Sequence, residues 1–156
     1  DGIDDYQLIA SPLSRTRKTA EIVCEVIGHD HYKITLDDRL MEISWGAWEG
    51  FTRLQIQARW PGIYDRRREN KWEFCPPNGE SYALLSERVG GWLKDITETD
   101  KLIVVTHGVA GRAIRGVYGR MPPGAAIGLG EPQDAFFLLS RGEITEIPVD
   151  AGENSR

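Results

Sequence analysis

The sequence predicts an α/β domain with a mostly parallel sheet covered by helices on both faces, a three-layer α/β/α arrangement. Short apolar runs alternate with segments of helical periodicity along the 156 residues. Two of the runs, YQLIAS and KLIVVTH, pass directly into helix-like segments, as strands of parallel sheets do. Near the end, the runs AFFLLS and EITEIP are joined only by Arg141 and Gly142, which indicates a hairpin.

The first strand is expected to end at Ser11, which we interpret as the N-cap of a helix with Pro12 at its first position. Gly28 is the expected C-cap of this helix. A second strand and its exit are predicted over residues 32–43, and a glycine-punctuated loop follows over 44–52.

A short helix is predicted from about Thr52 to a residue before Pro61. A turn at Pro76 and Pro77 then leads into a longer helix, whose apolar residues fit one face. The later expected elements are that helix at about 80–96, a buried strand at 101–107, a helix at 108–119, a loop at 121–132 and the two hairpin strands.

Length and composition indicate a single globular domain over residues 1–150 with a polar tail over 151–156. No run approaches the roughly 18 apolar residues of a membrane span. The net charge of −5 argues against nucleic acid as the main partner. The basic run Arg66–Arg68 has acidic neighbours and is interpreted as a solvated loop.

The two cysteines, Cys24 and Cys75, have no metal-binding spacing, and Cys24 lies on an apolar helical face, which predicts a buried thiol. Reduced thiols favour a cytoplasmic location.

Candidate site residues gather at two strand ends, because ligands of parallel sheets bind beyond the carboxyl ends of the strands. Arg15 follows the first of these ends, and His107 and Gly108 follow the other. An arginine, a histidine and the N–H groups of a helix start together form a good phosphate pocket. The alternatives for these residues are a core histidine and an ordinary surface arginine.

Glu42 follows a predicted strand and precedes a loop rich in aromatic residues, so it is a candidate general acid, with a surface carboxylate as the alternative. Glu80 is interpreted as a carboxylate that complements a helix dipole. Five aromatic residues either line a substrate pocket or fill the core, and the core is favoured for most of them: Trp45, Trp48, Trp60, Trp72 and Phe74.

Four segments in the same order resemble landmarks of the histidine phosphatase superfamily, also called the phosphoglycerate mutase-like family. They read ASPLSRTRKTAEIV, LMEISWGAWEG, PPNGESYALLSERVGGWL and VVTHGVAGRAIRGVYG. The resemblance implies phosphoryl transfer through a phosphohistidine, without a metal or another cofactor, on a small phosphorylated metabolite. It matches Arg15 and His107 to ligands of the phosphoryl oxygens and Glu42 to the proton donor.

The family's opening strand, which ends in Arg-His-Gly and carries the nucleophilic histidine, has no match here. The remaining histidines, His29 and His31, follow a helix end and are in the wrong context. We therefore expect an upstream segment that supplies the nucleophile, and no activity from a chain that lacks it. Since the missing strand would lie centrally in the sheet, residues 1–156 alone are expected to misfold or to borrow a strand from a partner.

The resemblance favours a phosphatase that acts on small phosphate esters, since the loop around ISWGAWEG looks like the phosphatase branch of the family. The alternatives are phosphoglycerate mutase activity and a phosphate-binding or interaction protein without catalysis. A homodimer remains an alternative to a monomer.

Overall fold

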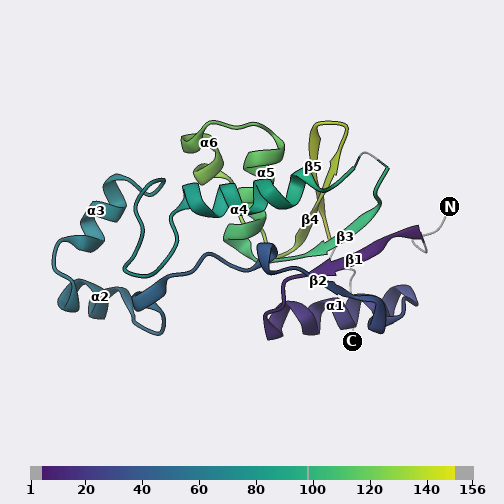
Figure 1. Cartoon of the computed structure of the whole chain (residues 1–156), viewed down its shortest axis with the longest axis horizontal. Helices are drawn as coiled ribbons and strands as arrows, with labels where there is room; N and C mark the ends of the chain where they lie inside the picture. The colour runs from purple at the N-terminus through teal and green to yellow at the C-terminus, as the bar shows by residue number, and fades with distance from the viewer. Residues whose placement is uncertain (1–4, 98, 150–156) are drawn as a thin grey trace, which may run out of the picture.

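The computed structural model describes residues 5–97 and 99–149. Its main sheet has β1 (Gln7–Ala10) at the centre, with β2 (Thr35–Leu36) on one side and β3 (Leu102–Val105) on the other. Both pairings are parallel, and Ala10 lies opposite both Leu36 and Val105. The three strands therefore end at the same edge of the sheet, where the site described below is located (Figure 1).

The two faces of the sheet are covered by different helices. On one face, Leu8 and Ala10 of β1 pack against Ala20 and Cys24 of α1 (Ser14–Ile27). On the other face, Ile9 of β1 packs against the core of α4 (Tyr82–Lys94) and α5 (Gly108–Tyr118). This alternation confirms the predicted three-layer arrangement, and Cys24, which has no exposed surface, confirms the predicted core thiol.

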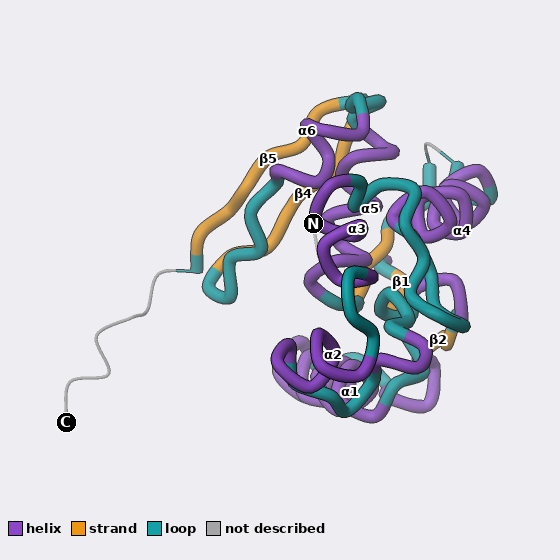
Figure 2. The backbone as a smooth tube through the Cα atoms, turned by 90° about the vertical axis from the view of Figure 1, so that its left-hand side faces the viewer, coloured by secondary structure: helices purple, strands orange, loops and turns teal. Residues whose placement is uncertain are grey.

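The predicted hairpin is confirmed as β4 (Ala135–Ser140) and β5 (Glu143–Pro148), which pair antiparallel in a separate sheet. Arg141 and Gly142 both have positive φ angles, as a tight two-residue hairpin turn requires. Figures 1 and 2 both place the hairpin beside α5 and α6 (Pro123–Gly128), on the opposite side of the molecule from α1.

The start of α1 differs from the prediction. The helix begins at Ser14 with Leu13 as its N-cap. A residue before a proline disfavours the helical conformation, and the hydroxyl of Ser11, which precedes Pro12, accepts from the N–H of Leu13 at 3.4 Å rather than from an N–H of the helix. The hydroxyl of Ser11 is consequently available to the site. The other end of α1 is as predicted, since Gly28 adopts a left-handed conformation with φ of 73°.

The second strand predicted within residues 32–43 is present but shorter than expected, since only Thr35 and Leu36 are in a strand. Asp37 accepts a hydrogen bond from the N–H of Arg39 at 2.9 Å, and Asp30 binds the N–H of Tyr32 in the same way. Such local bonds compete with strand pairing. The chain instead forms short 3₁₀ helices at His31–Lys33, Asp38–Leu40 and, after the strand exit, Gly46–Trp48.

The helix predicted at Thr52 is confirmed as α2 (Arg53–Arg59), with a capping box between Thr52 and Gln55. The basic run, by contrast, is not in a loop. It lies within α3 (Ile63–Glu69), where Arg67 stacks over the ring of Trp45 at 4.3 Å. The predicted loop at 121–132 contains α6, which has a proline in its first turn.

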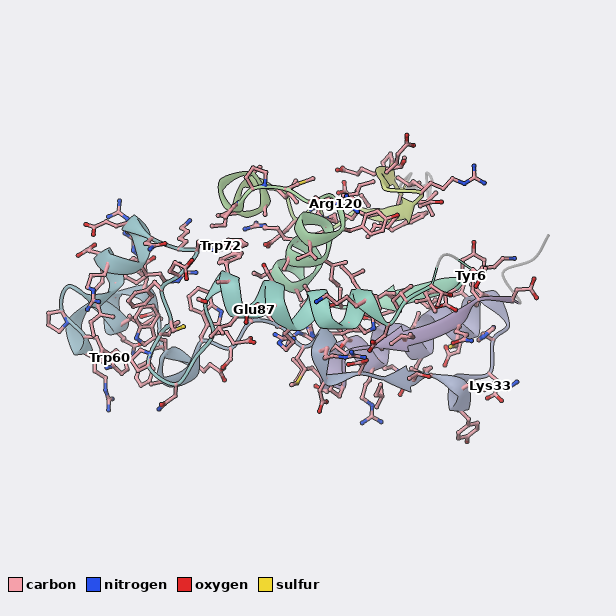
Figure 3. The ribbon with its side chains drawn as sticks, turned by 45° about the horizontal axis from the view of Figure 1, so that its top comes forward. Tyr6, Lys33, Trp60, Trp72, Glu87 and Arg120 are labelled. Atoms are coloured by element: carbon pink, nitrogen blue, oxygen red, sulfur yellow. The ribbon has the colours of Figure 1, made fainter. Side chains whose placement is uncertain are left out.

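Aromatic side chains form the core of the α2–α3 unit, which extends away from the sheet (Figure 1). Trp48 is 2% exposed, and the ring centroids of Tyr64 and Phe74 lie 6.0 and 5.8 Å from its own. Trp60 lies in this unit, whereas Trp72 lies between the unit and α4 (Figure 3). The core interpretation therefore holds for Trp48, and Trp45 and Trp72 are partly buried and pack against the core of α4 and α5. Trp60 and Phe74 are partly buried.

In the part of the chain that the structure describes, no helix combines the length and the apolar character that crossing a membrane demands. The predicted polar tail over 151–156 lies outside the described residues.

Candidate active site

An open pocket of about 290 Å³ lies at the carboxyl ends of β1 and β3. The four candidate residues from the sequence line it together, although they come from three separate parts of the chain. The lining consists of Arg15, Thr16, Thr19, Glu42, Val105, Thr106, His107, Gly108 and Gln133. Arg15 comes from the first turn of α1, and Gly108 is the first residue of α5.

His107 is held between two partners. The Nε–H of Arg15 donates to Nδ1 of His107 at 3.1 Å, and Nε2 of His107 lies 2.8 Å from the hydroxyl oxygen of Ser11. Since arginine can only donate, Nδ1 must be the unprotonated nitrogen, and Nε2–H therefore donates to Ser11. The ring is neutral in this arrangement. Sequence reasoning did not identify Ser11 as its partner, because the residue was assigned to a helix cap.

Burial, and after it the positive charges of Arg15 and Arg88, together lower the pKa of His107 from 6.5 to about 4. The pocket therefore holds an uncharged imidazole beside an arginine at neutral pH. An anion that entered this pocket would compensate the charge of Arg15.

The pKa of His107 predicts an acid-dependent loss of stability. Between pH 6.5 and pH 4 the unfolded chain binds a proton at this residue and the folded chain does not, so the free energy of unfolding falls as the pH is lowered through this range. The His107 contribution amounts to at most about 3 kcal/mol, and solvent screening at this partly exposed residue reduces it. Urea unfolding at pH 7 and pH 4.5 measures it.

The matched control is His107→Gln, whose amide can still accept from Arg15 and donate to Ser11 but does not titrate. The variant is expected to lose less stability than the wild type over the same pH range. Equal losses would contradict a neutral, acid-sensitive His107.

Glu42 caps the start of α5. Its Oε1 accepts from the N–H of Ala110 at 3.0 Å, and its Oε2 accepts from the N–H of Val109 at 3.3 Å. Both are among the N–H groups that a helix cannot satisfy internally, and the positive end of the helix dipole favours a carboxylate there. Gly108, the residue before these two, lines the pocket.

Arg88 of α4 positions the segment that carries Glu42. Its guanidinium donates to the carbonyls of Arg39 and Met41 at 2.8 and 3.0 Å and forms a two-pronged ion pair with Glu80. Glu80 in turn accepts from the N–H of Ser44 at 3.1 Å. The predicted dipole role of Glu80 is therefore replaced by this ion pair, and Ser81 is the N-cap of α4.

A second anchor for the same segment comes from the residue after β3, since the hydroxyl of Thr106 donates to the carbonyl of Leu40 at 2.7 Å. Neither Arg88 nor Thr106 was identified from the sequence. Both act through contacts between segments that are about fifty or more positions apart, and such contacts leave no local pattern.

The fold and the pocket define an α/β protein with a polar pocket at the carboxyl edge of a parallel sheet. Residues 2–132 match the model of the histidine phosphatase superfamily (branch 1), and the chain belongs to this family. Since the match covers most of the chain, it confirms the resemblance that the four sequence segments suggested.

Named relatives include both mutases and phosphatases. The chain is 27% identical over 109 residues to a phosphoglycerate mutase of Schizosaccharomyces pombe, a match that covers 67% of this chain and 52% of the relative. It is 29% identical over 110 residues to phosphoserine phosphatase 1 of Hydrogenobacter thermophilus, covering 69% and 51% of the two chains. The chain thus spans about half the length of these curated relatives.

Among solved structures, the α-ribazole phosphatase of Shigella flexneri superimposes with a TM-score of 0.78 at 18% identity. The superposition covers 94% of this chain and 73% of the other. At this identity the similarity establishes the fold alone, and it agrees with the three-layer arrangement described above.

Proposed function

We propose that the protein is a phosphohydrolase that cleaves small phosphate monoesters through a phosphohistidine intermediate. The supporting observation is that Arg15, His107 and the start of α5 converge on one pocket with Glu42. In this proposal the guanidinium of Arg15, the ring of His107 and the N–H of Gly108 bind the phosphoryl oxygens, and such binding is the main requirement of phosphoryl transfer.

In the proposed reaction, a histidine upstream of Asp1 attacks phosphorus, and the ester P–O bond breaks as the P–N bond forms. Glu42, which must first take up a proton from solvent, donates that proton to the leaving alkoxide and becomes a carboxylate. Water then attacks phosphorus and gives a proton to Glu42, and the P–N bond breaks to release inorganic phosphate. Two displacements replace one difficult step.

The upstream histidine is proposed to arrive on an additional strand that pairs with β3. Within the described residues, β3 pairs only with β1, so its other edge presents unpaired backbone groups. His107 and Gly108 follow β3 directly, so a strand at this edge would end close to them. This proposal predicts a nucleophile at the same pocket.

The test uses protein that includes the upstream segment, incubated with a ³²P-labelled phosphate monoester and quenched in alkali. An acid-labile, base-stable label on histidine, followed by release of inorganic phosphate, supports the proposal. Protein that binds phosphate but forms no such label would instead be a non-catalytic phosphate-binding protein.

Phosphoglycerate mutase activity is the second candidate, because one of the relatives is named a phosphoglycerate mutase. A mutase returns the phosphoryl group to its substrate, so its turnover depends on a bisphosphoglycerate primer, whereas hydrolysis does not. Phosphate release that is unaffected by the primer favours the phosphatase.

The variant Glu42→Gln tests proton donation. It is expected to slow hydrolysis of alkyl phosphates, which have poor leaving groups, by about 10²-fold or more, and to slow hydrolysis of p-nitrophenyl phosphate much less. The glutamine oxygen can still accept one N–H from the start of α5. Steady-state kinetics with both substrates measures the effect, and equal losses for both would exclude the acid role.

We also propose a cytoplasmic location, for which the free thiols of Cys24 and Cys75 are the support.

A further inference from the structure

The proposed chemistry assigns no role to Gln133, a polar residue of the pocket lining. Gln133 lies in the segment between α6 and β4 and lines the same pocket as Arg15, His107 and Gly108. Its side chain is exposed at the rim. The phosphoryl group is expected to lie next to Arg15 and His107. A residue at the rim of the pocket would then face the alcohol part of the phosphate ester.

The segment that presents Gln133 is anchored to α5 at two points. The guanidinium of Arg115, which is 7% exposed, donates to the carbonyl of Gly130 at 2.6 Å. Arg112 forms an ion pair with Glu131 at 2.6 Å. The first residue of α5, Gly108, also lines the pocket. These two contacts therefore hold the segment that carries Gln133 in a fixed position relative to Gly108.

The hydrogen bonds of Gln133 leave its acceptor available. Its Nε2 donates to the carbonyl of Glu131 at 3.2 Å, so the amide oxygen faces away from that bond and the second N–H remains for a ligand. An amide with one free acceptor and one free donor matches a hydroxyl group, which is both a donor and an acceptor.

Glu131 adds no net charge beside this segment, because Arg112 forms an ion pair with it. The expected selectivity therefore depends on the neutral amide of Gln133, which can bind a hydroxyl group but offers no charge to an anionic substituent.

We infer that Gln133 is a specificity-determining residue, whose side chain binds a hydroxyl group on the alcohol part of the substrate. The protein thereby favours polyol or sugar phosphates over plain alkyl phosphates. This inference rests on the proposed phosphatase function. It assigns no part to Gln133 in the reaction at phosphorus.

The test compares glycerol 1-phosphate with propyl phosphate, which share a three-carbon chain and differ in hydroxyl groups, using protein that includes the upstream segment. In the wild type, kcat/KM is expected to be higher for glycerol 1-phosphate. Gln133→Leu is expected to lower the ratio of the two kcat/KM values by about 3- to 10-fold, the range of one neutral hydrogen bond, chiefly through KM.

The matched control is Gln7→Leu, because Gln7 is an exposed glutamine at the end of β1 that is far from the pocket. This variant is expected to leave the ratio unchanged. A ratio that Gln133→Leu leaves unchanged, or rates that fall equally for both esters, would overturn the specificity role. Wild-type protein that hydrolyses neither ester, nor any other phosphate monoester, would overturn the proposed function itself.

Discussion

Replacement of Arg15 by alanine is expected to lower kcat by about 10²- to 10³-fold, the loss typical of removing one donor that stabilises transition-state charge. Arg15 is exposed on α1, while the buried face of that helix carries Thr16, Ala20 and Cys24. The substitution therefore removes no core contact, and alanine is the best helix former. Steady-state kinetics and a thermal unfolding curve on the same protein separate catalysis from folding.

Arg17 provides the control, because it is exposed on the same helix and is absent from the pocket lining. Arg17→Ala is expected to retain near-normal activity. Arg15→Lys is expected to recover only part of the loss, since a lysine lacks the planar fork that can bind two oxygens. Near-normal activity of Arg15→Ala would exclude its assignment to the phosphoryl group.

The substitution has a second consequence, because the charge of Arg15 contributes to the low pKa of His107. Without that charge the pKa of His107 is expected to rise, although burial still holds it below the ordinary value. A merely structural arginine would not shift the titration of His107, which proton NMR of the imidazole can follow.

The sequence predicted the parallel sheet, the helices α4 and α5 on one of its faces, and the hairpin, because the sequence signals of these elements are local. Apolar periodicity, Gly28 and the Arg141–Gly142 turn each determine structure within a few residues. The strand predicted with its exit over 32–43 is limited to Thr35 and Leu36, because Asp30 and Asp37 bind nearby N–H groups and these side-chain bonds compete with regular pairing.

The candidate site was predictable in part for a similar reason. Arg15, His107 and Gly108 lie only a few residues after strand ends, so parallel strands bring them to one edge. Arg88, Thr106 and Gln133 reach the site or its supporting segment through contacts between distant parts of the chain. Their positions depend on how α4, α5 and the hairpin pack, which no short pattern encodes.

His107→Ala is expected to lower kcat by at least about 10²-fold and to weaken the binding of inorganic phosphate. The reason lies in the protonation of the ring. In the unliganded pocket, Nδ1 accepts from Arg15, and its lone pair would repel a phosphate oxygen. An anion in the pocket favours the charged imidazole, so His107 is expected to take up a proton at Nδ1 while Arg15 turns to the anion.

Phosphate binding by the wild type should therefore be accompanied by proton uptake, which calorimetry in buffers of different ionisation enthalpy measures. His107→Gln keeps a side chain that can bind Ser11 but cannot gain a proton, so its binding should show less proton uptake than that of the wild type. The same uptake in both proteins would assign the proton to another group, and His107 would then act on phosphate only as a neutral neighbour of Arg15. Such a histidine could donate to the phosphoryl group only after breaking its bond to Ser11, because Nε2 carries its single proton.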